Sequence, residues 1–478
     1  MKQAAVTLPR STAEAQGIPS EAIAGFLDDL AGQSIEAHSF MIVRNGHVVA
    51  EGAWRPYRIE DRHMLFSLSK SFTSTAIGFA AAEGLLSLDD QVVRYFPKDL
   101  PDEASPLLEE MRIRHLLTMS TGHEKDTVPL GSDRSEDNWA KAILSQPVVH
   151  PPGTHFVYNS GATYLLSAIL HRVTGVPLLE YLGPRLLEPL GIANATWETC
   201  PRGIAAGGWG LRVAVEDIAK FGLLYLQKGI WEGKRILPEG WAEEATSKQI
   251  DNGSDADNDW HQGYGYQFWR CRHGAYRGDG AYGQFCIVLP EQAAVVAVTS
   301  GTDNMGAIMQ AVWDNLLPAM RPEPIGDNDR TARSLTERLQ SLRYDPPSAE
   351  AANPAAEQRM NGIVYRLDTN SAELESMAFV FDEDRISVTM VNSRGEQYVS
   401  AGRSVWRESV CSLLDDSEQT VAASIAWSDS ETFRLKLRFV ETPFTFDVVV
   451  RPMDDGTIEI EVQEFADKKD SPQIIGRA

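Results

Sequence analysis

The sequence predicts an α+β protein in which an antiparallel sheet is flanked by helices, joined to an all-helical lobe and followed by a small all-β, barrel-like C-terminal domain. Three observations support this fold class. Apolar strand patterns surround the turn Asn45-Gly46 and return after residue 264. Helical periodicity dominates between about residues 90 and 205. Beyond residue 355 the apolar period changes to two, which is typical of a barrel or sandwich.

The same patterns place the elements along the chain and suggest a division into residues 1–320, a linker over residues 321–355 and an accessory domain over residues 356–478. His115 and Asp217 are expected to support helix starts rather than catalysis. Expected helices cover residues 18–30, 72–82, 107–117, 139–144, 162–173, 178–187, 217–226, 305–317 and 334–342. Expected strands cover residues 39–43, 48–50, 264–269, 284–289, 293–299, 378–381, 386–391, 433–439, 444–450 and 458–462.

Composition narrows the classes of partner. The chain has 478 residues and a formal net charge of −23, so it should repel nucleic acid and anionic membrane surfaces. Its four cysteines are widely spaced and contain no C-x-x-C pair, which argues against a zinc site or a dense disulfide framework. Residues 1–10 lack an apolar signal core, and no apolar run is long enough to cross a bilayer. A cytoplasmic location is therefore expected.

Ser67 and Lys70 form the strongest local candidate for chemistry. They lie three residues apart at the start of the amphipathic helix that contains Phe72 and Phe79, so both side chains can share one face of its first turn. A serine hydroxyl is a poor nucleophile until a neighbouring base takes its proton, and an amine kept neutral by burial could do so. The free N–H groups of a helix start also point toward the group that the serine would attack.

A series of further motifs carries a family resemblance. In chain order the motifs are Phe66-Ser67-Leu68-Ser69-Lys70-Ser71-Phe72, residues 84–90 running into 95–97, residues 113–122, residues 152–161 with Tyr158-Asn159-Ser160, residues 207–211 running into 216–222, and residues 278–284 followed by Pro290-Glu291. Together they resemble the serine beta-lactamase and penicillin-binding-protein-like hydrolases, in particular the class C-like branch that includes esterases, D-aminopeptidases and 6-aminohexanoate-dimer hydrolases. The resemblance covers about residues 15–318.

The resemblance implies roles for four residues. Ser67 is the expected acyl-forming nucleophile, Lys70 its proton acceptor, and Tyr158 the tyrosine of the second family motif. Near a lysine ammonium a tyrosinate would be favoured, so Tyr158 could relay protons, and either Lys70 or Tyr158 could be the general base. Ser160 stands where many relatives have asparagine, and it could bind substrate or Lys70.

The third family motif departs further from the pattern. Relatives often have Lys-Thr-Gly or His-x-Gly on the strand that lines the site, and here we place Gly278-Asp279-Gly280. No cation occupies the first position, although Arg277 directly precedes it, so binding of a substrate carboxylate is not expected. The backbone N–H of Ala281, after Gly280, should pair with that of Ser67 as an oxyanion hole.

These features predict a serine hydrolase that needs neither metal nor cofactor and acts through an acyl-enzyme on esters or amides of small molecules or short peptides. The alternatives are a beta-lactamase, D,D-carboxypeptidase or D-aminopeptidase, or a non-catalytic penicillin-binding or sensor-like protein. By the same resemblance, residues 361–367 and 379–381 match a barrel-like accessory domain, which in relatives shapes the cleft or mediates pairing, so a homodimer is one candidate assembly.

Overall fold

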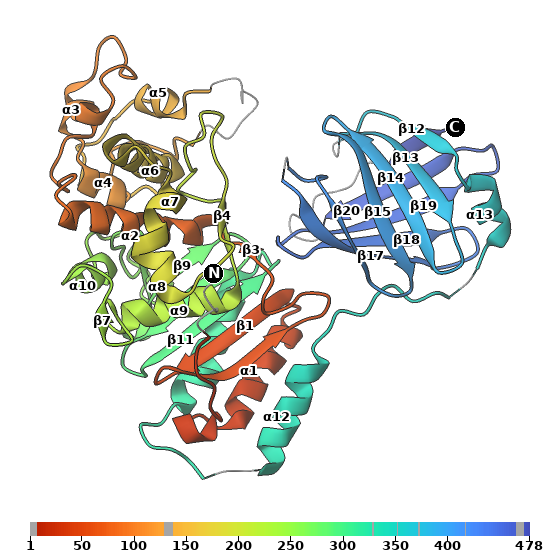
Figure 1. The fold of residues 1–478 in the computed structure, drawn as a ribbon, viewed down its shortest axis with the longest axis horizontal. Coiled ribbons are helices and arrows are strands. Elements are labelled where there is room, and N and C mark those ends of the chain that lie inside the picture. The colour runs from red at the N-terminus through yellow and green to blue at the C-terminus, as the bar shows by residue number, and fades with distance from the viewer. Residues whose placement is uncertain are drawn as a thin grey trace.

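The computed structural model describes residues 7–128, 137–326, 329–350, 352–370, 373–415, 417–464 and 473–478. A six-stranded antiparallel sheet lies between layers of helices, a helical lobe rises above it, and a separate β-barrel follows toward the C-terminus (Figure 1). The predicted fold class is therefore confirmed.

The helical elements are η1 (Glu14–Gln16), α1 (Ser20–Gly32), η2 (Phe66–Leu68), α2 (Ser69–Ala82), η3 (Val92–Tyr95), α3 (Pro106–Glu110), α4 (Ile113–Leu117), α5 (Trp139–Leu144), α6 (Ser160–Thr174), α7 (Leu178–Leu182), η4 (Gly183–Leu187), α8 (Glu188–Leu190), α9 (Val215–Leu226), α10 (Trp241–Thr246), η5 (Arg272–Gly274), α11 (Met305–Ala311), η6 (Val312–Leu316), η7 (Leu317–Ala319), α12 (Asp329–Ser341) and α13 (Pro354–Met360).

The strands are β1 (Ala37–Arg44), β2 (His47–Ala53), β3 (His63–Met64), β4 (Thr196–Trp197), β5 (Leu211–Val213), β6 (Ile230–Trp231), β7 (Lys234–Arg235), β8 (Trp269–Arg270), β9 (Tyr276–Gly280), β10 (Gln284–Leu289), β11 (Ala294–Ser300), β12 (Val364–Leu367), β13 (Leu374–Phe381), β14 (Arg385–Asn392), β15 (Gly395–Arg403), β16 (Arg407–Cys411), β17 (Gln419–Trp427), β18 (Phe433–Phe439), β19 (Thr445–Pro452), β20 (Ile458–Glu464) and β21 (Ile474–Arg477).

The central sheet is buried on both faces. Its strand order is β2-β1-β11-β10-β9-β8, and neighbouring strands run antiparallel. Successive side chains of a strand point to opposite faces, so β1 supplies two apolar layers. Phe40 and Ile42 join the layer formed with α1 and α11, whereas Met41 and Val43 join the layer formed with α2 and α9. This double packing supports β9, which lies next to the edge strand β8.

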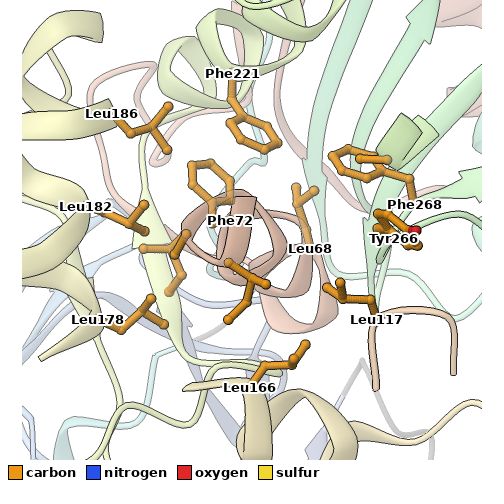
Figure 2. Close-up of a cluster of buried hydrophobic side chains, with 14 of the residues drawn as sticks. Leu68, Phe72, Leu117, Leu166, Leu178, Leu182, Leu186, Phe221, Tyr266 and Phe268 are labelled. Atoms are coloured by element: carbon orange, nitrogen blue, oxygen red, sulfur yellow. The ribbon is translucent and has the colours of Figure 1, made fainter. Parts of the chain in front are cut away.

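Helix α2 lies at the centre of the larger apolar core. Phe72 of α2 stacks on Phe221 of α9, with ring centroids 3.9 Å apart. Leucine side chains from α6, α7 and η4 surround the pair (Figure 2). Apart from its last two residues, α2 is buried throughout. The helix that carries Lys70 is thus fixed from all sides.

Two predicted elements of this region differ in the structure. The expected helix over residues 107–117 is broken into α3 and α4, because the chain turns extended at Met111, whose carbonyl accepts from the Val92 N–H at 2.8 Å. The expected strand over residues 264–269 is wrong except at its last residue, which begins β8. There Gln267 adopts a left-handed φ of 64°, and its side-chain amide donates to the carbonyls of Leu116 and Leu117 instead of continuing a ladder.

The predicted helix starts are confirmed. His115 Nδ1 accepts from the Arg112 N–H at 3.1 Å, and Asp217 Oδ2 accepts from the Ala214 N–H at 3.2 Å, so both side chains cap the helices they begin. Among the described residues, no single helix is long and apolar enough to span a bilayer; α6 together with Leu178–Leu190 meets that measure only as a pair bent by 73°.

The segment predicted as a linker is partly built into both neighbours. Helix α12 packs on α1, where Arg338 Nη1 donates to the Ala24 carbonyl at 3.1 Å. On the barrel side, the Glu350 N–H donates to the Trp427 carbonyl of β17 at 3.0 Å, and α13, which begins at the end of the predicted linker, buries Ala356 and Met360 in the barrel core. The division at residues 320 and 355 remains a prediction.

The C-terminal barrel is a ring of nine strands in which β15 closes against β17 through a short parallel contact, Gly402 opposite Ser424. Strand β16 pairs with β17 beside this closure. Alternating residues of β18 face the barrel core, as the period of two predicts. The turn between β18 and β19 points toward the central sheet of the first domain, where the candidate site lies.

Candidate active site

Ser67 lies where a tight turn enters a buried helix. It occupies η2, which continues directly into α2, and its side chain is half-buried. The preceding residue, Phe66, has a left-handed φ of 47°, an uncommon conformation for an aromatic residue that costs about 1–3 kcal/mol. Such strain persists only where the surroundings hold it, and it often marks functional sites.

Lys70 is brought directly to Ser67. Its Nζ donates to Ser67 Oγ at 2.8 Å and to the Gly208 carbonyl at 2.9 Å, while the side chain is only 1% exposed. Burial lowers the pKa of the Lys70 ammonium to about 7, and the carboxylates of Asp126 and Asp279 oppose this shift only in part. Near neutral pH a large share of Lys70 is therefore an uncharged amine beside the serine.

Tyr158 reaches the same point from the helical lobe. Its hydroxyl hydrogen-bonds with Ser67, and Lys70 Nζ lies 4.8 Å from the centre of its ring. Burial, and then the negative charge of Asp279, raise the pKa of Tyr158, although the hydrogen bond with Ser67 acts in the opposite direction. The expectation of a tyrosinate is thus wrong: the lysine beside it is itself depleted of charge, and the phenol stays neutral.

Ser160 lies next to this group as the first residue of α6. Its N–H donates to Asp126 Oδ1 at 2.9 Å, and the Gly161 N–H donates to the same oxygen at 3.4 Å. A Cβ placed on Gly208 would lie 3.5 Å from the Ser160 Cβ. Ser160 is therefore adjacent to the carbonyl that holds Lys70.

Strand β9 lies against the Ser67 turn with no room between them. A Cβ on Gly280 would lie 2.0 Å from the Leu65 carbonyl oxygen and 3.0 Å from the Ser67 nitrogen, so only glycine allows this approach. The Gly280 carbonyl accepts from the Gly283 N–H at 3.2 Å, and the Ala281 N–H points to the other side of that planar peptide. An oxyanion role for Ala281 and Ser67 stays a prediction.

Arg277 does not replace the cation missing from the third motif. It is fully buried, and its Nε donates to Asp279 Oδ2 at 2.9 Å. Its Nη1 donates to the Asp259 carbonyl and to Cys271 Sγ, both at 3.0 Å, while the guanidinium lies 4.5 Å from the Trp260 ring centre. These contacts hold Arg277 in place and neutralise Asp279.

Two contributors to the site were not predicted from the sequence. Gly208 acts through its backbone carbonyl, and the Gly207-Gly208 pair was the only local signal of a close backbone approach. Asp126 lies in an exposed loop and belongs to no sequence motif. Only the structure identifies it as part of the site, because the fold brings it to the start of α6.

The sequence is similar to that of known proteins. A family model described as Beta-lactamase matches residues 23–319. The 6-aminohexanoate-dimer hydrolase of Paenarthrobacter ureafaciens is 25% identical over 305 residues, which cover 59% of this chain and 77% of that protein.

Solved structures show the same fold at lower identity. The octameric penicillin-binding protein homologue from Pyrococcus abyssi is 18% identical with a TM-score of 0.51, over 95% of this chain and 99% of that one. EstCE1, a hydrolase with promiscuous acyltransferase activity, is 20% identical with a TM-score of 0.51, over 62% of this chain and 99% of that one. At these identities the likeness concerns the fold alone.

Proposed function

The chain belongs to the Beta-lactamase family of serine hydrolases, and from this premise we propose that it cleaves uncharged esters or amides of small molecules or short peptides through an acyl-enzyme. The observation that carries the proposal is the 2.8 Å contact between Ser67 Oγ and an amine whose pKa is about 7. A neutral Lys70 can accept the hydroxyl proton across this distance.

The proposed acylation step uses each of these groups. Ser67 Oγ attacks the carbonyl carbon as its proton passes to Lys70 Nζ, and the N–H groups of Ser67 and Ala281 receive the negative oxygen that forms. When the tetrahedral intermediate collapses, the bond to the leaving group breaks and that group takes a proton from Lys70, directly or through the Tyr158 phenol. Water then attacks the acyl carbon and gives up a proton to Lys70, the bond between that carbon and Ser67 Oγ breaks, Oγ regains the proton, and the acid is released.

The charges around the site support an uncharged substrate. Asp126 is exposed beside Ser160, and Arg277, the nearby cation of β9, is buried and paired with Asp279. A carboxylate on the substrate would meet the Asp126 carboxylate, and Arg277 is not free to bind it. This favours an esterase or amidase over an enzyme that recognises penicillins or peptides ending in a carboxylate.

The proposal is tested by incubating the protein with p-nitrophenyl esters, N-acetylated D- and L-amino acid amides and nitrocefin, and by following turnover and intact mass. We expect hydrolysis of the uncharged compounds and a transient acyl adduct on the tryptic peptide of residues 63–70, at Ser67 rather than Ser69. Faster cleavage of nitrocefin than of any uncharged compound would contradict the choice of substrate. No turnover with any compound, or an adduct at another residue, would contradict the acyl-enzyme.

The rate should depend on pH through Lys70. Because its pKa is lowered to about 7 and the neutral amine is the base, kcat/KM for an ester should fall about tenfold per unit below pH 6 and level off above pH 8. A pH–rate profile measures this, with thermal melts across the range as a check on folding. A rate that keeps rising through pH 10 would point instead to ionisation of Tyr158, whose pKa is raised.

A further inference from the structure

The turn that joins β18 to β19 in the barrel contacts the first domain beside Ser67. The Met64 N–H donates to the Glu441 carbonyl at 2.8 Å, and Arg62 Nη2 forms an ion pair with Glu441 Oε2 at 2.9 Å. On the other side of the turn, a Cβ on Gly301 would lie 2.6 Å from the Pro443 carbonyl oxygen. The turn is therefore fitted between β3 and the end of β11.

This turn places one aromatic ring against two others. The Phe444 centroid lies 5.7 Å from that of Tyr282 and 6.3 Å from that of Phe66, and the latter two rings lie 5.3 Å apart. All three interplanar angles are between 70° and 80°, so the rings meet edge to face, the arrangement that aromatic pairs prefer. We call Phe66, Tyr282 and Phe444 the aromatic brace.

Two members of the aromatic brace flank the groups that must hold the oxyanion. Phe66 directly precedes Ser67, and Tyr282 directly follows Ala281. Both have left-handed backbones, with φ of 47° and 64°, so both ends of the predicted oxyanion hole carry strain. The Tyr282 carbonyl accepts from the Thr302 N–H at 3.2 Å and from Ser300 Oγ at 2.7 Å, so the backbone of this loop is fixed while its ring packs in the brace.

We propose that Phe444, supplied by the C-terminal barrel, is a positioning residue that holds the Ser67 turn and the Ala281 loop at the spacing that oxyanion binding needs. The proposal rests on the proposed acyl-enzyme function. Among the described residues, no contact joins Phe444 directly to Ser67 or Lys70. Its effect on the site therefore passes through Phe66 and Tyr282. The barrel is thereby part of the catalytic machinery of the first domain.

The test compares Phe444→Ala with Phe444→Tyr and with Phe446→Ala in the full chain. Phe446 lies two residues further along the chain, in β19, but its ring packs on Phe439, 5.8 Å away, within the barrel. The readouts are the second-order rate of fluorophosphonate labelling at Ser67, kcat and KM for p-nitrophenyl acetate and a longer ester, the pH midpoint of the rate and the melting temperature.

We expect Phe444→Ala to lower kcat and the labelling rate about 10- to 100-fold, because misplacement by about 1 Å costs that much, with KM changed less than about twofold. The pH midpoint should stay unchanged, because Lys70 keeps its partners. Phe444→Tyr keeps the aromatic ring and should therefore retain most of the wild-type kcat and labelling rate. Phe446→Ala should lower the melting temperature while kcat stays near that of the wild type.

Other results would overturn the positioning role. They are an unchanged kcat in a folded Phe444→Ala protein, an equal loss of kcat in Phe446→Ala, or a loss confined to KM for the longer ester, which would make Phe444 a wall of the acyl pocket. If Phe444→Ala does not fold, Phe444→Leu gives the same comparison. If the wild type is not labelled at Ser67, the proposed function is refuted together with the role of the aromatic brace. If the wild type is labelled, the comparison of the variants tests the aromatic brace alone.

Discussion

Ser67→Ala should reduce kcat/KM by about 10⁴-fold or more and abolish fluorophosphonate labelling, because no second hydroxyl can take over the attack. Ser69, the other serine between residues 67 and 70, is fully buried, and its Oγ accepts from the Leu211 N–H at 3.1 Å. The variant should fold normally, since Ser67 is only half-buried. Steady-state kinetics with the best ester and intact-mass analysis measure both effects.

Ser74→Ala is the matched control for this prediction. Ser74 lies on the same helix, and its buried hydroxyl donates to the Tyr266 carbonyl at 2.7 Å, away from the site. Losing that bond should cost about 1 kcal/mol of unfolding free energy and leave the activity in place. A Ser67→Ala protein that keeps more than about 1% of the activity would refute the nucleophile assignment.

Lys70→Met should have two opposite effects. It should lower kcat/KM by about 10²- to 10⁴-fold, because the general base is lost, and it should stabilise the fold, because a buried amine is replaced by an apolar side chain of similar length. The gain should be on the order of 2 kcal/mol near pH 6, after subtracting the hydrogen bonds to Ser67 and Gly208. Urea unfolding at several pH values measures it.

The sign of the pH dependence follows from the lowered pKa. Between pH 7 and 10.5 the unfolded chain keeps the Lys70 proton and the folded protein does not, so the wild type gains stability as the pH rises. The advantage of Lys70→Met is therefore largest below pH 7 and disappears above about pH 10.5. A Lys70→Met protein that is less stable than the wild type at pH 6 would contradict a buried, readily discharged amine.

Lys220→Met tests the opposite case, a buried lysine whose charge is paired with a carboxylate. Lys220 is also buried, but its Nζ lies 3.3 Å from Asp217 Oδ1, so its charge has a partner. Removing it leaves the Asp217 carboxylate unpaired inside the protein, which should destabilise the fold by about 3 kcal/mol. Catalysis should remain, since Lys220 belongs to α9 and has no described contact with Ser67.

Elements with strong local signals were predicted well, and those defined by their surroundings were not. The Asn45-Gly46 turn sets the β1–β2 hairpin, because both residues adopt the positive φ that such a turn requires. Residues 264–269 alternate like a strand, yet their polar and glycine positions serve contacts with the helical lobe. Strand β17 was missed because its small residues, Ala422 and Ala423 among them, are buried on both faces and show no alternation.

The residues of the candidate site fall into the same two groups, those predictable from local sequence and those that depend on their surroundings. Ser67 and Lys70 follow from spacing along one helix, whereas Tyr158 depended on the family resemblance, because nothing local links residue 158 to residue 67. The Gly208 carbonyl and the Phe444 ring could not be predicted. The sequence does not show which backbone carbonyl will accept a hydrogen bond from a lysine. A barrel residue becomes a neighbour of the site only through the packing of two domains.

The close packing of β9 also bears on how this enzyme could evolve. A Cβ on Gly278 would lie 2.4 Å from Leu68 Cδ1 and 2.7 Å from Ser71 Oγ, which itself holds the Gln267 carbonyl. A lysine at this position, as in relatives with Lys-Thr-Gly, therefore requires the side chains of Leu68 and Ser71 to shift. Gaining a cation at residue 278 thus calls for accompanying changes at Leu68 or Ser71, so we expect the two positions to constrain one another during divergence.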